Sequence, residues 1–118
     1  MAKKHLFKKH RKERGKYGFT AWDTYDLVSY LTRVVGGSLR ELAKEVRGCP
    51  GWFYAKAGEN AEQGTARWVK TLNEIADGLD AGLDWFNNGE ATNTKDPRYK
   101  AYKRAMRKLS KHWFNLWY

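Results

Sequence analysis

The chain has 118 residues, with 23 Lys or Arg against 13 Asp or Glu and a formal net charge of +10. Its single cysteine, Cys49, excludes an internal disulfide framework, and no apolar run reaches the roughly 20 residues that span a bilayer. The length is enough for one hydrophobic core, so we expect a soluble, intracellular protein that does not enter a membrane.

The positive charge is concentrated at the two ends of the chain. Residues 1–16 and residues 95–118 each have a net charge of +7, whereas residues 17–94 have a net charge of −4. Like charges repel one another unless a partner neutralises them, so this pattern predicts an anionic ligand or nucleic acid as partner. The pattern does not identify the anion.

Residues 1–16 have no helical period and contain only two large apolar side chains, Leu6 and Phe7. Two interpretations are open. The segment is a solvated, flexible tail, or it is a basic N-terminal arm that lies along phosphate or another acidic surface. In both cases we expect residues 17–118 to form a single helical domain.

The first predicted helix runs from about residue 21 to residue 47. Thr20 and Asp23 have the spacing of a short capping box at its start. Its apolar residues keep one helical phase across Gly36-Gly37, which favours a single helix with any kink at the glycines. These apolar residues are Leu27, Leu31, Val34, Val35, Leu39, Leu42 and Val46.

A long loop is expected over residues 48–64, which contain four glycines and a proline and show no sustained period. A second helix follows over residues 65–87, with Thr65 as its N-cap and Gly89 after its end. Its amphipathic face consists of Trp68, Leu72, Ile75, Ala76, Leu79, Leu83 and Phe86.

The third predicted helix covers residues 97–117, with Asp96 as its cap and Pro97 in its first turn. One face has apolar residues at alternating spacings of three and four, typical of a helix that packs lengthwise on a neighbour. This face contains Tyr99, Tyr102, Met106, Leu109, Trp113 and Leu116. The opposite face contains Lys100, Lys103, Arg104, Arg107, Lys108 and Lys111. No strand-like alternation persists, so the predicted fold is an all-α three-helix bundle.

The residue types that carry enzymatic chemistry are scattered along the chain. His5, His10, His112 and Cys49 lack the paired spacing of a zinc site, and Cys49 has no base near it in sequence. A phosphate-binding glycine motif is absent. We therefore predict a protein that is not an enzyme and that needs no cofactor or metal.

Aromatic and cationic residues lie near one another at several positions. We assign Trp68 and Trp113 to the packed helix faces. Trp52, Phe53 and Tyr54 belong to no helix face, so they form either a hydrophobic plug under the loop or a surface on which a base stacks.

Several segments together resemble a widespread group of small, uncharacterised bacteriophage proteins. They are YGFTAWDTYDLVSYLTRVV at 17–35, GCPG at 48–51, GTARWVKTLNEIADGLDAG at 64–82 and FNLW at 114–117. The resemblance covers most of residues 17–117. It implies a phage origin, hence the cytoplasm of the infected bacterial host, and a helical fold, but it implies no activity.

Three classes of function remain open. The first is capture of an anionic, nucleotide-like ligand, for instance to sequester a host defence signal. Its predicted site has phosphate contacts from Arg40 and Arg47, stacking on Trp52 and Tyr54, and a wall formed by Trp22 and Tyr25.

The second class is sequence-tolerant nucleic-acid binding by the basic arm and the last helix. The predicted phosphate contacts are Lys8, Lys9, Arg11, Lys12, Lys103, Arg104, Arg107 and Lys108. The third class is a virion component or an inhibitor that docks on a host protein, for which the aromatic residues suit an interface. The helix faces also suit self-association into a homo-oligomer.

Overall fold

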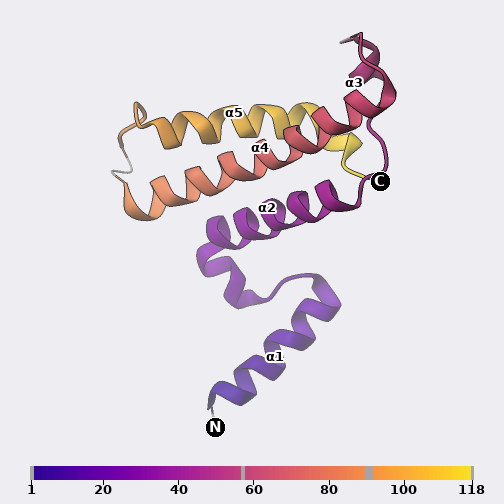
Figure 1. Cartoon of the computed structure of the whole chain (residues 1–118). Coiled ribbons are helices and arrows are strands. Elements are labelled where there is room, and N and C mark those ends of the chain that lie inside the picture. The colour runs from indigo at the N-terminus through magenta and orange to yellow at the C-terminus, as the bar shows by residue number, and fades with distance from the viewer. Residues whose placement is uncertain (1, 57, 90–91, 118) are drawn as a thin grey trace. The chain divides into compact units, whose positions relative to one another are not determined.

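The computed structural model describes the backbone of residues 2–56, 58–89 and 92–117, and the side chains of these residues except 2–7 and 54–56. Within these ranges the chain forms five α-helices and two short 3-10 helices, without a strand (Figure 1). They are α1 (Ala2–Tyr17), η1 (Ala21–Asp26), α2 (Leu27–Glu45), α3 (Gly51–Lys56), α4 (Ala61–Asn88), α5 (Pro97–His112) and η2 (Trp113–Asn115). The all-α prediction is confirmed, whereas the number of helices and several boundaries differ from the predicted three-helix bundle.

The chain divides into two compact units, Met1–Leu31 and Thr32–Tyr118. The division falls within α2, whereas the sequence predicted a boundary after residue 16. The basic segment thus belongs to a unit that also contains η1 and the first turn of α2.

In the first unit, α1 occupies the segment for which the sequence showed no helical period. Lys, Arg and Glu have good helix propensity without any apolar pattern, and polar contacts tie α1 to η1. Arg14 donates two hydrogen bonds to the Asp23 carboxylate, at 2.8 and 3.3 Å, and the Glu13 carboxylate accepts one from the Ala21 amide at 3.2 Å. Gly18 makes the turn between the helices with a φ of +79°, which a glycine adopts without strain.

The predicted capping box at Thr20 is confirmed. The Thr20 hydroxyl accepts a hydrogen bond from the Asp23 amide at 3.1 Å, and the Asp23 carboxylate accepts one from the Thr20 amide at 2.9 Å. The box starts the 3-10 helix η1 and not an α-helix. After η1, α2 continues through Gly36 and Gly37 as predicted and ends at Glu45.

The second unit is built on α4 and α5, which lie side by side and antiparallel (Figure 1). Two glycines of α4 permit the close approach. A Cβ atom at Gly78 would lie 2.5 Å from the Ala105 Cβ and 2.8 Å from the Ala101 carbonyl oxygen, and one at Gly82 would lie 2.7 Å from the Tyr102 Cβ. The buried core residues are Leu39, Ala43, Phe53, Trp68, Leu72, Ile75, Ala76, Leu79, Ala105 and Leu109.

The C-terminal part of α2 packs on this core through Leu39 and Ala43. Beside them, Arg40 donates to the carboxylates of Asp77 and Asp80 of α4, each at 2.7 Å. The predicted apolar face of α2 is only partly buried. Val35, Leu42 and Val46 are half-buried against the core, whereas Leu27, Leu31 and Val34 are exposed.

The buried face of α5 differs from the predicted one. Ala105, Leu109 and His112 are buried, whereas Met106 and Trp113 have exposed fractions of 40% and 52%. The assignment of Trp113 to the core is therefore wrong. The physical reason is the close contact at Gly78, because only small residues of α5 fit against it and this rotates the larger side chains away from α4.

The predicted loop over residues 48–64 contains α3 and the first turn of α4. The N-cap of α4 is Asn60, which forms a capping box with Gln63, and the predicted cap Thr65 instead donates its hydroxyl to the Ala61 carbonyl at 2.8 Å. The predicted cap at Asp96 is confirmed, since its carboxylate accepts a hydrogen bond from the Arg98 amide at 2.9 Å.

Candidate functional site

Rings from α3, α4 and α5 form an aromatic cluster in the second unit. The Trp52 ring stacks on the His112 ring at a centroid distance of 5.6 Å and an angle of 12°. Phe53 and Trp68 meet His112 edge-on at 5.8 and 5.0 Å. Phe53 is buried and Trp52 is partly exposed, so the interpretation as a hydrophobic plug is confirmed for Phe53.

Arg67 of α4 fixes α3 over this cluster. Its guanidinium lies 3.6 Å from the centroid of the Phe53 ring and donates to the Phe53 carbonyl oxygen at 2.7 Å. It also donates to the Glu59 carboxylate at 2.8 Å. The hydrogen bonds and the cation–π contact of Arg67 are therefore used to hold the fold.

His112 is buried at the centre of the cluster, and its Nδ1 atom has no hydrogen-bond partner among the described residues. Burial lowers the pKa of His112, because the charged imidazolium loses its hydration, and nearby positive charges lower it further. These charges belong to Lys111, Lys108 and Arg67. Both effects favour the neutral form of the imidazole.

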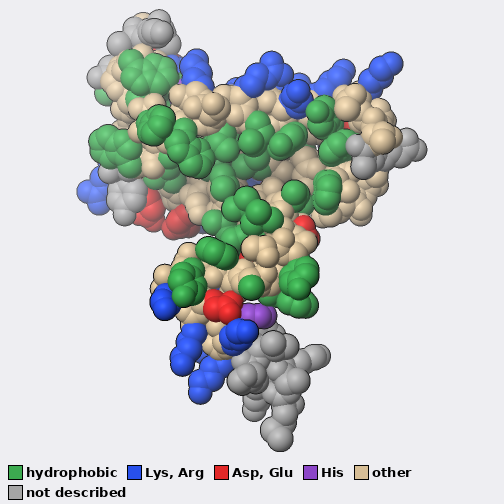
Figure 2. Space-filling view, turned by 180° about the vertical axis from the view of Figure 1, so that it is seen from behind, with side chains coloured by type: hydrophobic (Ala, Val, Ile, Leu, Met, Phe, Trp, Pro, Cys, Tyr) green, Lys and Arg blue, Asp and Glu red, His purple; other side chains and the backbone are tan. Residues whose placement is uncertain are grey.

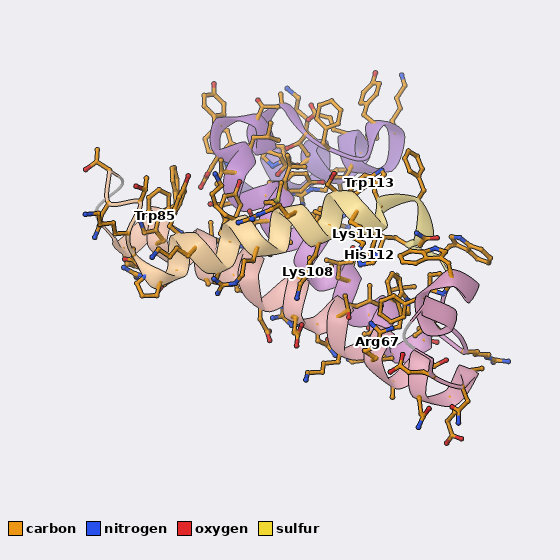
Figure 3. The ribbon with its side chains drawn as sticks, turned by 90° about the horizontal axis from the view of Figure 1, so that it is seen from above. Arg67, Trp85, Lys108, Lys111, His112 and Trp113 are labelled. Atoms are coloured by element: carbon orange, nitrogen blue, oxygen red, sulfur yellow. The ribbon has the colours of Figure 1, made fainter. Side chains whose placement is uncertain are left out.

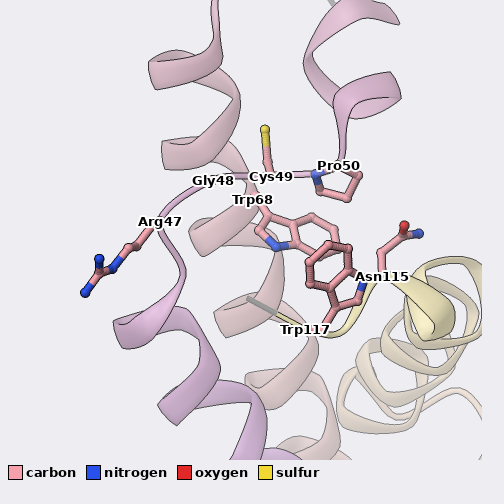
Figure 4. A pocket seen from close by; sticks show the side chains of 7 residues that line it. All are labelled: Arg47, Gly48, Cys49, Pro50, Trp68, Asn115 and Trp117. Carbon is pink, nitrogen blue, oxygen red and sulfur yellow. The ribbon is translucent and has the colours of Figure 1, made fainter.

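A cavity of about 230 Å³ lies beside the cluster. The segment 47–50 borders it on one side, and Trp68, Asn115 and Trp117 complete its lining (Figure 4). Figure 4 shows the Arg47 guanidinium extended away from the two indoles, so this charge lies outside the cavity. Trp68 is buried, whereas Trp117 has an exposed fraction of 73%.

Of the six residues predicted to bind a nucleotide-like ligand, the described lining of this cavity contains Arg47. Arg40 is paired with two carboxylates of α4, and Trp52 covers His112. Tyr54 lies in α3, but its side chain is outside the described ones.

Trp22 and Tyr25, the predicted wall of that site, belong to the first unit. Their ring centroids are 5.2 Å apart, and both rings are exposed. Trp22 also stacks on His10 of α1 at 6.2 Å. The structure thus brings these two rings together as a pair, with α1 beside them.

The predicted cations of α5 form a stripe on its exposed face, which we call the α5 stripe. Figure 2 shows Lys and Arg side chains along the edge that α5 forms. Figure 3 places Lys108 and Lys111 on the C-terminal half of α5. Lys108 contacts the Glu74 carboxylate at 3.2 Å, which compensates its charge in part. The exposed cations of the α5 stripe are Lys100, Lys103, Arg104, Arg107, Lys108 and Lys111.

The four predicted phosphate contacts of the basic arm lie in α1. Lys8, Arg11 and Lys12 are exposed at spacings of three and four, which places them on one face of the helix. Lys9 is also exposed and lies 3.9 Å from the Glu13 carboxylate.

Sequence reasoning missed an apolar strip beside the α5 stripe and, apart from Arg47, the residues that form the cavity. Met106, Trp113 and Phe114 are exposed, and Phe114 has an exposed fraction of 90%. The available signal was the run Trp113–Trp117, which is too rich in large apolar side chains for a segment near the end of a basic helix.

Comparison of the chain with protein-family models, with curated proteins and with solved structures finds no match. In the described part of the chain, no helix has the length and apolar character to cross a membrane. The described residues also contain no group of His, Cys, Asp and Glu arranged to hold a metal ion.

Proposed function

We propose that the protein binds nucleic acid without reading its base sequence, and that the α5 stripe makes the main contact with phosphates. The observation that carries this proposal is the exposure of six cations on one side of α5. They cover about 140° of the helical wheel and extend over about 16 Å of the helix axis. Such a surface neutralises several neighbouring phosphates and releases their counterions.

The fold fixes the direction in which the α5 stripe faces. The buried residues Ala105 and Leu109 hold the opposite side of the helix against α4. A stripe on a packed helix has a defined shape, so its cations are placed before a strand arrives. This lowers the entropy that has to be lost when the strand binds.

The composition of the exposed face supports binding that tolerates any sequence. Between Pro97 and His112 the helix contains no Asn, Gln, Asp or Glu, so the amide and carboxylate side chains that pair with adenine and cytosine edges are absent from it. Lys and Arg contacts to phosphate position a strand but do not select its bases. The apolar strip at Met106, Trp113 and Phe114 adds surface on which any base stacks.

The salt dependence of DNA affinity tests the proposal. For a labelled DNA duplex, the triple variant Lys103→Gln, Arg104→Gln, Arg107→Gln should reduce the slope of log K against log salt by roughly 2 to 3, because each phosphate contact contributes about 0.9. Fluorescence anisotropy over a range of salt concentrations measures this slope.

The matched control is the triple variant Arg33→Gln, Lys44→Gln, Lys70→Gln, which removes the same charge from α2 and α4. Lys44 and Lys70 lie 3.8 and 3.9 Å from the carboxylates of Glu41 and Glu74. We expect this control to keep most of the slope of the unmodified protein. Equal slopes for the two triple variants would contradict the proposal, because net charge alone would then account for binding.

A further inference from the structure

We infer that the cavity between Trp117 and the segment 47–50 binds a single unpaired nucleobase. This inference rests on the proposed function, since it adds a base site to the same nucleic-acid surface. Asn115 follows Lys111, the last cation of the α5 stripe, by four residues, which is at most about 14 Å of chain. A strand on the stripe therefore reaches the cavity with its next nucleotides.

The Trp117 side chain is exposed, whereas its backbone is anchored by the residues before it. The preceding residue, Leu116, packs against the hydrophobic core, and the Trp117 amide donates to the Asn115 carbonyl oxygen at 2.9 Å. An indole with an exposed fraction of 73% leaves most of its apolar surface in water. An exposed indole on an anchored backbone at the edge of a cavity is a platform on which a base can stack.

The size and lining of the cavity favour a base over a larger ligand. Its volume of about 230 Å³ is below the roughly 300–1,000 Å³ of pockets for drug-sized ligands, so it suits a ring system without its sugar and phosphates. Trp68 and Pro50 provide apolar lining, and the Asn115 amide provides a donor and an acceptor for the edge of a base.

The carboxylates in their lining distinguish two other hollows of the same unit from this cavity. The hollow between α4 and α5 is lined by Glu74 and Asp77 together with Arg104 and Lys108. The hollow at the start of α4 is lined by Glu62 together with Arg47. Carboxylates repel a phosphate backbone. The described lining of the Trp117 cavity contains no carboxylate, and the exposed Arg47 lies at its border.

The base must be unpaired to enter. In a duplex both faces of a base are covered by its neighbours, and extruding it requires unstacking and unpairing. Two sources supply an unpaired base attached to phosphate, namely a single-stranded nucleic acid and a free nucleotide. The proposed function favours the single strand, and the experiment distinguishes the two.

The test compares a labelled single strand, the same strand with abasic sites, and its duplex, all bound to the full chain. We expect Trp117→Ala to weaken binding of the single strand by about 5- to 150-fold, the range found when a stacked aromatic is replaced by alanine. Binding of the abasic strand and of the duplex should change little. Trp117→Phe should restore most of the affinity, because it keeps a ring for stacking.

Two further variants make the result specific to the cavity. Asn115→Ala should weaken binding of the single strand while leaving the indole in place. Phe86→Ala removes an exposed ring of α4 that does not border the cavity and lies outside the proposed binding surface. It is the matched control, and we expect it to have a much smaller effect than Trp117→Ala.

Failure of the inference and failure of the proposed function are distinguishable. If Trp117→Ala binds all three probes as the unmodified protein does, or weakens all three equally, the base site is refuted while the salt-dependent contact of the α5 stripe stands. If nucleoside monophosphates raise the melting temperature in a Trp117-dependent way and no oligonucleotide binds, the base site stands. The base that binds there then belongs to a free nucleotide, and the proposed function is refuted.

Discussion

The neutral, buried ring of His112 makes the free energy of unfolding depend on pH. Because burial and nearby cations lower the pKa of His112, the folded protein binds fewer protons than the unfolded chain below the ordinary value of about 6.5. The free energy of unfolding therefore falls as the pH decreases from about 6.5 to the lowered pKa of the folded state. Above this window His112 contributes no pH dependence.

Replacing His112 by phenylalanine tests this account. The His112→Phe variant keeps a ring between Trp52 and Trp68 and removes both the titration and the unpaired Nδ1 atom. We expect it to be at least as stable as the unmodified protein at neutral pH and to lose less stability between pH 6.5 and 5. Urea denaturation at several pH values measures this.

The His112 effect is separated from other titrations by its pH window. Hydrogen bonds from Arg14 and Arg98 lower the pKa of Asp23, Asp84 and Asp96, so the stability that depends on these carboxylates is lost only when the pH falls below about 4. His10→Gln is the control, since it removes a histidine from α1. Loss of the acid sensitivity in both histidine variants would contradict the assignment to His112.

Residues whose structural role is local could be predicted from the sequence. The caps at Thr20 and Asp96 bond within three residues of themselves, so the spacing of residue types was sufficient. The cap at Asn60 is equally local, but Gly58 and Gly64 on either side of it indicated a loop. Gly64 is in fact buried in the first turn of α4.

At the scale of helices, the close contact between α4 and α5 depends on the lack of a side chain at Gly78. The apolar period of α5 favoured Met106 and Trp113 as the buried residues. The structure buries Ala105 instead, because a close approach to Gly78 selects a small side chain. The choice of the buried residue thus depends on residues of two helices. The periodicity of α5 alone therefore does not predict it.

We expect Gly78→Ala to lower the free energy of unfolding by about 1–2 kcal/mol, although alanine has the better helix propensity by about 1 kcal/mol. The added Cβ would lie within 3 Å of the Ala101 carbonyl oxygen and the Ala105 Cβ, so the two helices would have to separate. Urea denaturation followed by circular dichroism measures the change.

Gly37→Ala is the matched control for Gly78→Ala. Gly37 also lies inside a helix, but a Cβ there meets no atom within 4 Å. We expect this variant to be more stable than the unmodified protein by about 0.5–1 kcal/mol. If Gly78→Ala also stabilised the protein, the prediction would be wrong, because α4 and α5 would then accommodate the added Cβ without losing packing energy.

At the scale of the whole molecule, charge was the part of the candidate site that the sequence predicted. The cations of the α5 stripe are exposed, as their positions opposite the apolar residues indicated. The described cations Lys8, Lys9, Arg11 and Lys12 of α1 are exposed too, as the absence of an apolar pattern there suggested. The cavity could not be predicted, because the segment 47–50 and Trp117 come from distant parts of the chain. Only the packing of α2, α4 and the segment after α5 brings them to one place.

The two groups of cations lie in different compact units, so their contributions to DNA binding should be independent. We expect the triple variant Lys8→Gln, Arg11→Gln, Lys12→Gln to reduce the salt slope for a duplex by roughly 2 to 3 if all three contact phosphates. These positions leave Arg14 and its hydrogen bonds to Asp23 intact, so α1 keeps its contact with η1.

Combining this triple variant with the triple variant of the α5 stripe separates two ways of binding. If the two units contact different phosphates, the slope changes add, because distant sites without shared partners act independently. The sextuple variant should then lose roughly 4 to 6 units of slope relative to the unmodified protein. A sextuple slope equal to that of the stripe variant alone would mean that α1 makes no phosphate contact, and that its charge only attracts the strand toward α5.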